Sequence, residues 1–256
     1  MVEVAVLGSG SKGNSTLVRC SGAALLIDAG LSARQIVRRL REVGQDPDGV
    51  GAILLTHEHG DHVGGVRVFA SRRGVPVFGS EGTLRAAAPA LGPVDRCSFR
   101  TGAAFRIGPF GIRAFPLPHD AEDPVGFVLE ADGVRIGYAT DLGHVTHLVA
   151  ERLTGCDLLV FEANHDRQML LEGSYPWEVK QRVASRLGHL SNDHAASELS
   201  RIVGEKTRHV VVAHLSEKNN DPGLARAVVE GTLREAGHRN VAVHVARQDR
   251  PSVVRL

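Results

Sequence analysis

The segment at residues 56–65, which reads THEHGDHVGG, constrains the fold of this chain more than any other part of the sequence. It directly follows the apolar run AILL at residues 52–55, which predicts a buried strand. The six positions 57–62 contain three histidines and an aspartate: His57, His59, Asp61 and His62. A strand in this place would deliver all four polar side chains to one end of a sheet.

The spacing of these side chains predicts two metal sites. Residues two apart at the end of an extended strand lie on one side, so His57 and His59 can bind one ion. If a helix begins at Gly60, Asp61 and His62 return toward the same point and offer an oxygen and a nitrogen to a second ion. The alternative is a histidine-rich surface loop, but this residue set behind an apolar strand favours the metal sites.

Composition and charge exclude several classes of protein. The length of 256 residues fits one large α/β domain or two small ones, and the hydrophobic content of 43% is ordinary for a globular protein with a large core. The formal net charge of +1 gives no overall attraction to nucleic acid or membrane. Cys20, Cys97 and Cys156 lie far apart and indicate neither a disulfide framework nor a thiolate zinc site. The sequence shows no charged leader and no membrane-spanning run, so we expect a cytoplasmic protein.

Short apolar runs between turn residues predict alternating strands and helices, as in the α/β class. We expect strands at residues 2–7, 16–18, 23–27, 52–55, 75–79, 104–117 (strand-turn-strand), 126–131, 134–139, 156–161, 209–213 and, as a closing edge strand, 241–245. We expect helices at residues 32–40, 66–73, near 84, and at 146–153, 177–187, 193–203 and 223–236. The loop GSGSKGNS at residues 8–15 lacks P-loop spacing and is either a flexible hairpin or a loop that lines the site.

The pattern H-x-H-x-D-H after a strand resembles the signature of the metallo-β-lactamase fold of hydrolases. The resemblance implies a four-layer αββα sandwich of two mixed β-sheets flanked by helices, here as a single domain of residues 1–256. It also implies further site residues. His119 would be the third ligand of the first ion, His214 would complete the second site, and Asp141 would bridge the two ions. Asp28 would support the metal-binding loop from behind, although a turn cap is the alternative for this residue.

The number and arrangement of the candidate ligands predict a hydrolase. The first ion would be held by His57, His59 and His119, and the second by Asp61, His62 and His214, with Asp141 between them and a bridging position left for solvent. Sites that stay open are catalytic, and two divalent ions about 3.5 to 4 Å apart lower the pKa of a shared water. The nitrogen-rich ligand set favours zinc, while manganese and iron also fit.

A second motif indicates the substrate. The phrase GHLSNDHAA at residues 188–196 resembles the segment of ribonuclease Z that brings a catalytic histidine to the scissile phosphate. We therefore expect His189, together with Asp61, to be catalytic, with His189 as general acid or phosphate contact. The alternative is that His189 caps the helix that starts at Asp193. The expected substrate-binding residues are Ser191, Asn192, Asn14, Asn164 and Lys218.

Most of the chain resembles one bacterial branch of this fold, the YycJ/WalJ type, through LLIDAG, PHDAEDPVGF, FEANHD and HLSEKNN among other segments. Members of that branch are regarded as DNA exonucleases acting from the 5′ end. The leading prediction is thus a phosphodiester hydrolase, a 5′ to 3′ DNA exonuclease that uses a hydroxide between its two metal ions. The alternatives are a thioester or small-ester hydrolase of the glyoxalase II type and a non-catalytic regulatory or nucleic-acid-binding partner that keeps its metals. The oligomeric state is not predicted.

Overall fold

Strand β1 (Val2–Gly8) is buried on both of its faces, as expected of a strand that is covered on both sides. In the computed structural model, which describes residues 1–256, Val4 packs into the core between two sheets. Its neighbour Ala5 packs into a separate core beneath the helices on the other face. Strand β11 (Leu158–Glu162) alternates in the same way between the central core and the core of the opposite helices. The alternation therefore builds layers outward from a central core of 25 buried residues.

The strands form two seven-stranded mixed sheets. The first has the order β14-β1-β2-β3-β4-β5-β6 and the second the order β13-β12-β11-β10-β9-β8-β7. Besides β1, the first sheet contains β2 (Ser15–Cys20), β3 (Ala23–Ile27), β4 (Ala52–Leu54), β5 (Val77–Ser80), β6 (Arg96–Phe99) and β14 (Ser252–Arg255). Besides β11, the second contains β7 (Ala104–Ile107), β8 (Phe110–Pro116), β9 (Val125–Ala131), β10 (Val134–Ala139), β12 (His209–Ala213) and β13 (Ala242–Val245). Strands β3 to β6 and β10 to β13 run parallel.

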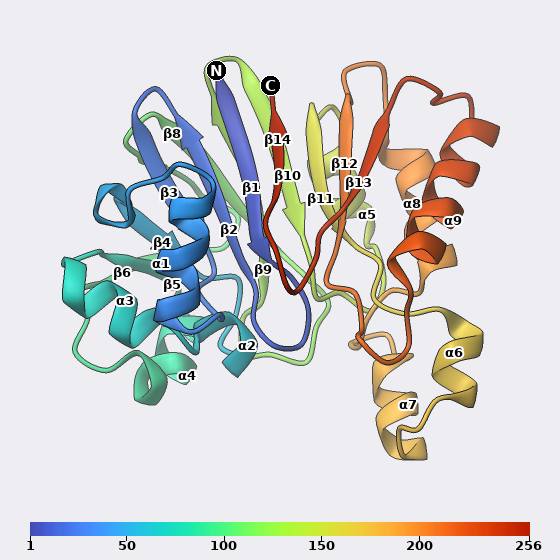
Figure 1. Ribbon diagram of the computed structural model, residues 1–256, viewed down its shortest axis with the longest axis horizontal. Coiled ribbons are helices and arrows are strands. Elements are labelled where there is room, and N and C mark those ends of the chain that lie inside the picture. The colour runs from blue at the N-terminus through green and yellow to red at the C-terminus, as the bar shows by residue number, and fades with distance from the viewer.

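Helices cover the outer face of each sheet, which confirms the predicted four-layer αββα sandwich (Figure 1). On the first sheet they are α1 (Ala33–Glu42), α3 (Val66–Arg73) and α4 (Glu81–Leu91). On the second they are α5 (His147–Leu153), α8 (Asn192–Ile202) and α9 (Pro222–Glu235). Helices α6 (Arg167–Glu172) and α7 (Trp177–Val183) extend beyond the sandwich at its lower right in Figure 1. The short elements are α2 (Gly60–Val63) and the 3-10 turn η1 (Pro47–Gly49), and no helix is both long and apolar enough to cross a membrane.

Several elements differ from the sequence predictions. Strands β6 and β14 and helix α6 were not predicted, because each is short and buries only one residue fully, which leaves no clear apolar pattern. The expected helix at 177–187 ends at Val183, where its carbonyl accepts the backbone N–H of His189. Strand β13 is an edge strand as predicted, but the last strand is β14, which pairs with β1 in the other sheet.

The chain that leaves β3 supports the metal-binding segment directly. The backbone N–H of Ala29 donates to the carbonyl of His62 over 2.9 Å, and Gly30 donates to Asn14 over 2.8 Å. Asn14 in turn donates its backbone N–H to the carbonyl of Asp61 over 2.8 Å. The approach at Gly30 is so close that a Cβ atom there would lie 1.6 Å from the carbonyl oxygen of Asp61. Only glycine permits this packing.

Overpacking usually costs about 1 to 3 kcal/mol. We predict that Gly30→Ala destabilises the protein by more than this range, because the new methyl group meets backbone atoms that cannot easily move. It should also weaken metal binding, since Asp61 must move. Thermal unfolding and metal analysis test this, with Gly204→Ala as the control because a Cβ atom at Gly204 meets nothing within 4 Å. Wild-type stability and metal content in Gly30→Ala would contradict the prediction.

Candidate metal centre

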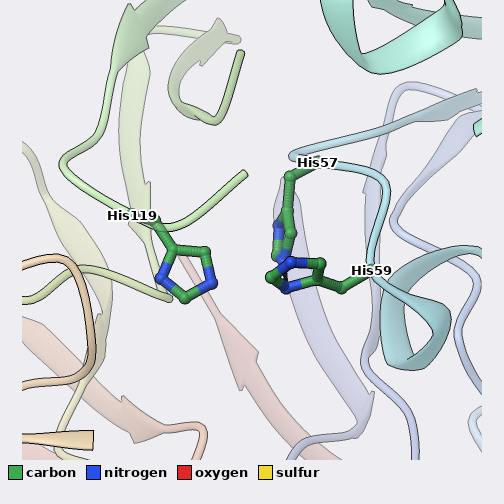
Figure 2. Close-up of side chains that lie close together, drawn as sticks. All are labelled: His57, His59 and His119. Atoms are coloured by element: carbon green, nitrogen blue, oxygen red, sulfur yellow. Dashed lines mark hydrogen bonds between the residues drawn. The ribbon is translucent and has the colours of Figure 1, made fainter. Parts of the chain in front are cut away.

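Three histidines that follow strands of the two sheets converge at the end of the sheets (Figure 2). His57 and His59 follow β4, whereas His119 follows β8. His57 Nε2 and His59 Nδ1 lie 3.1 Å apart. Their other ring nitrogens carry the protons, because His57 Nδ1 donates to the hydroxyl of Thr56 over 3.0 Å and His59 Nε2 to the carbonyl of Asp120 over 3.2 Å. The two facing nitrogens therefore present lone pairs to the same point.

His119 completes this first ligand set. Its Nδ1 donates to the carbonyls of Leu187 and Gly188, over 3.1 and 3.2 Å, which leaves Nε2 unprotonated. That Nε2 atom is buried and has no hydrogen-bond partner. Nitrogen ligands about 2.0 to 2.1 Å from a tetrahedral zinc ion lie about 3.3 Å from one another, close to the spacing of His57 and His59.

The second ligand set comprises Asp61, His62 and His214. The Nε2 atoms of both histidines lie 3.5 Å from Asp61 Oδ2. His62 and His214 are buried, and Asp61 lies at the border of the pocket. His214 Nε2 is a second buried atom without a hydrogen-bond partner.

Asp141 lies between the two sets. Its Oδ2 is 3.4 Å from His62 Nε2, and its Oδ1 is 3.3 Å from His214 Nδ1. It also groups with His57 and His62 within metal-ligand spacing. Asp141 Oδ2 is a third buried atom without a hydrogen-bond partner. Because unpaired buried polar atoms are costly, three of them at the centre of seven ligand-type side chains fit a site for divalent cations.

Asp28 lies behind the ligands and not among them. Its fully buried carboxylate accepts the backbone N–H and the hydroxyl of Thr56 and the Nδ1–H of His62, each over 2.8 Å. Burial raises the pKa of Asp28, and the neighbouring His62 opposes this rise. The contact fixes the His62 tautomer so that Nε2 faces the site.

Three site residues adopt the left-handed backbone conformation, which side chains other than glycine rarely accept. They are Asp28, Asp141 and His214, with φ of 58°, 63° and 56°. Each stands one or two residues beyond the end of its strand, on β3, β10 and β12 respectively. Such residues cost about 1 to 3 kcal/mol each and persist where the surrounding structure holds them. The turn redirects each side chain across the end of the sheet.

Glu162, at the end of β11, belongs to the segment FEANHD of the sequence analysis, which assigned this residue no specific role in the site. Its fully buried carboxylate accepts His189 Nδ1 over 2.8 Å and His214 Nδ1 over 2.9 Å. It also accepts the backbone N–H groups of Asp141, Leu142 and Leu190. Burial alone would raise the pKa of Glu162, but the two histidines hold it well below its usual range. A charged residue that ends the apolar strand LLVFE must be paired, and this signal could have identified it.

His189 lines the same pocket as both ligand sets, a cavity of about 390 Å³. Because its Nδ1 donates to Glu162, Nε2 remains available to a substrate. The cap of helix α8 is the hydroxyl of Ser191, which accepts the backbone N–H of His194, so His189 is not the helix cap. The pocket also contains Arg182, which forms no ion pair.

None of the predicted substrate-binding residues lines the metal pocket, and most of them form hydrogen bonds within the protein. Asn14 donates to Asp61 Oδ2 over 3.2 Å, and Asn164 donates to the carbonyl of His214 over 2.8 Å. Asn192 exchanges two 2.9 Å hydrogen bonds with Asn220. Lys218 is the exposed member of the group, and its ammonium lies 5.4 Å from the ring centre of Tyr175. The buried members therefore hold the ligand loops in place.

The carboxylates of the site retain protons on two of the ligand histidines when no cation is bound. Burial lowers the pKa of His214, but Asp141, Asp61 and Glu162 more than offset this and raise it to about 10. Burial also lowers the pKa of His62, but Asp141 and Asp28 more than offset this and raise it well above its usual value. A divalent cation would take the place of these protons.

Two open ligand sets at one pocket of a four-layer αββα fold define a metal-dependent hydrolase. The family model of the beta-lactamase superfamily domain matches residues 24–215, and the chain belongs to this family. Exodeoxyribonuclease WalJ of Streptococcus pneumoniae serotype 2 (strain D39 / NCTC 7466) is 38% identical over 239 residues, covering 91% of this chain and 89% of that protein. Exodeoxyribonuclease YycJ of Bacillus anthracis is 35% identical and covers 92% and 90%. The metallo-β-lactamase fold protein YhfI of Bacillus subtilis shares the fold, with a TM-score of 0.74 and 16% identity over 100% of both chains.

We predict that Asp28→Ala lowers metal affinity about ten- to a hundredfold, because it frees the ring of His62. Asp28→Asn should lose less, since asparagine tolerates the left-handed backbone and keeps one acceptor oxygen. Competition with a chromophoric chelator measures both affinities. Wild-type affinity in Asp28→Ala would show that the buried carboxylate does not orient the ligand.

We also predict that metal binding releases protons, because His214 binds a cation only as a neutral imidazole. Since the pKa of His214 in the metal-free protein is about 10, the apparent affinity should rise with pH up to about that value. Calorimetric titration in buffers of different ionisation enthalpy counts the released protons. An affinity that does not change with pH would contradict this assignment.

Proposed function

We propose that this protein is a metal-dependent deoxyribonuclease that removes nucleotides from the 5′ end of a strand. The observation that carries the proposal is His189, which lines the same pocket as both ligand sets and is held there by the buried Glu162. The thiolate leaving group of a thioester does not require a positioned acid at this place, whereas the alkoxide leaving group of a phosphodiester does. The names of the two exodeoxyribonucleases that resemble nearly the whole chain support DNA as the substrate.

Two divalent cations, held by the ligand sets described above, would supply Lewis acidity that activates water and neutralises charge on the phosphate. The remaining task falls to His189. Burial lowers its pKa, but the adjacent Glu162 more than offsets this, so the pKa of His189 is raised and the protonated ring is favoured. With Nδ1 held by Glu162, the proton on Nε2 faces the pocket and can pass to the departing oxygen.

Other residues of the pocket bind and orient the substrate. Arg182 forms no ion pair, so its guanidinium is free to contact a phosphate of the strand. Asp61, the second candidate catalytic residue, faces the pocket while Asn14 fixes one of its oxygens. We propose zinc or manganese as the metal, with iron as a further possibility for this ligand set. The free cysteines Cys20, Cys97 and Cys156 support a reducing compartment such as the cytoplasm.

The proposal is tested with metal-reconstituted protein and DNA oligonucleotides labelled at either end. A 5′ to 3′ exonuclease releases a labelled mononucleotide at once from a 5′-labelled strand and shortens a 3′-labelled strand stepwise. Turnover of an acyl-glutathione without cleavage of DNA would identify a thioester hydrolase instead. No turnover of any substrate by protein that holds two ions would identify a non-catalytic partner.

We predict that His189→Ala keeps both metals but loses at least about a hundredfold in oligonucleotide cleavage, the usual contribution of a general acid. The loss should be much smaller with bis-p-nitrophenyl phosphate, whose leaving group needs no proton. His147→Ala is the control, because His147 is exposed at the start of α5. Equal losses on the two substrates would assign His189 to phosphate binding and not to proton transfer.

A further inference from the structure

A second pocket lies beside the metal pocket, and the two share His189. Its volume is about 330 Å³, which is within the range of cavities that bind one small ligand. The walls come from the loop after β10, the start of α6, the loop before α8, and α8 itself. The residues used below are Arg167, Arg186, His144, His165, His194 and Glu198.

The second pocket is positively charged. Arg167 and Arg186 are exposed, and neither guanidinium takes part in an ion pair. Arg186 Nη2 lies 3.3 Å from His144 Nε2, which keeps it at the pocket wall. The one carboxylate of the lining, Glu198, lies 3.6 Å from Arg201 and is thereby neutralised. Two unpaired arginines suit a phosphate, whose oxygens accept their hydrogen bonds in pairs.

The inner wall adds hydrogen-bonding capacity. His165 is 3% exposed, and its Nδ1 has no hydrogen-bond partner in the protein. Burial lowers the pKa of His165 to about 4, so the ring is neutral at pH 7. His194 lines the same cavity and is exposed to solvent. A ligand with several polar groups therefore finds both charged and neutral partners here.

The position of His189 determines which part of the substrate reaches this pocket. Hydrolysis breaks the bond between phosphorus and the 3′ oxygen of the upstream nucleotide, and the oxygen of water forms the new bond to phosphorus. One proton passes from His189 to the departing 3′ oxygen, so the upstream nucleotide leaves on the side of His189. The second pocket borders His189, and for a strand degraded from its 5′ end the upstream nucleotide is the terminal one.

We propose that the second pocket binds the 5′-terminal nucleotide, with Arg167 and Arg186 on its 5′-phosphate. This inference rests on the proposed function. It explains removal of single nucleotides, because the pocket accepts only the end of a strand. Each cut leaves a new 5′-phosphate on the remaining strand, and that group is the ligand for the next cycle. A strand that begins with a 5′-hydroxyl is therefore cut slowly only in the first step, because the later cycles start from a 5′-phosphate.

The test compares two otherwise identical 3′-labelled oligonucleotides, one with a 5′-phosphate and one with a 5′-hydroxyl. Wild-type protein should make the first cut about ten- to a hundredfold faster on the phosphorylated strand, the factor expected from a charged hydrogen bond. The variant Arg167→Ala/Arg186→Ala should lose this preference but keep its rate for the first cut of the hydroxyl strand and its rate on bis-p-nitrophenyl phosphate. The control Arg72→Ala/Arg250→Ala removes the same charge from exposed positions elsewhere and should behave as wild type.

The outcomes separate the two proposals. Cleavage of DNA by wild-type protein without preference for the 5′-phosphate, or a preference that survives in the double variant, overturns the pocket assignment and leaves the nuclease intact. Absence of DNA cleavage overturns the proposed function itself. If the alanine variant does not fold, Arg167→Lys/Arg186→Lys replaces it and should retain part of the preference, because charge remains while paired hydrogen bonds are lost.

Discussion

A histidine binds a metal ion through one ring nitrogen while its other nitrogen keeps the proton, and the structure around the site satisfies this constraint at every ligand histidine. In each case an oxygen atom of the protein accepts the second N–H. These acceptor oxygens belong to Thr56, Asp120, Asp28, Leu187 with Gly188, and Glu162. The nitrogens left over all face one pocket. The N–H groups that the ligand histidines retain therefore fix the loops after the strands through these hydrogen bonds.

Two buried carboxylates, one from each sheet, orient most of these histidines. Asp28 at the end of β3 binds His62 directly and reaches His57 through the hydroxyl of Thr56. Glu162 at the end of β11 binds His214 and His189 together. Burying a carboxylate away from water costs free energy unless it is paired. Each of these two carboxylates is therefore held in its hydrogen bonds, directly or through Thr56, to two histidines. Glu162 links a metal ligand to the proposed acid, which sets their relative position.

Much of this arrangement could be predicted from the sequence, because apolar runs give the strands and polar residues after strands meet at one sheet edge. His57, His59, Asp61 and His62 follow from spacing alone. The left-handed backbone at Asp141 and His214 could not be predicted, since it depends on packing that a local pattern does not contain. For the same reason Asn14 and Asn192 were expected to contact substrate, although the folded chain surrounds them with protein partners.

We propose that seven side chains from the two sheets hold two cations at one pocket. A crystal structure of metal-reconstituted protein with anomalous diffraction at the metal absorption edge tests it directly. We predict two peaks, one within bonding distance of His57, His59 and His119 and the other of Asp61, His62 and His214, with Asp141 bound to both. A single peak, or an ion held by Asp28 or by Glu162, would contradict the account.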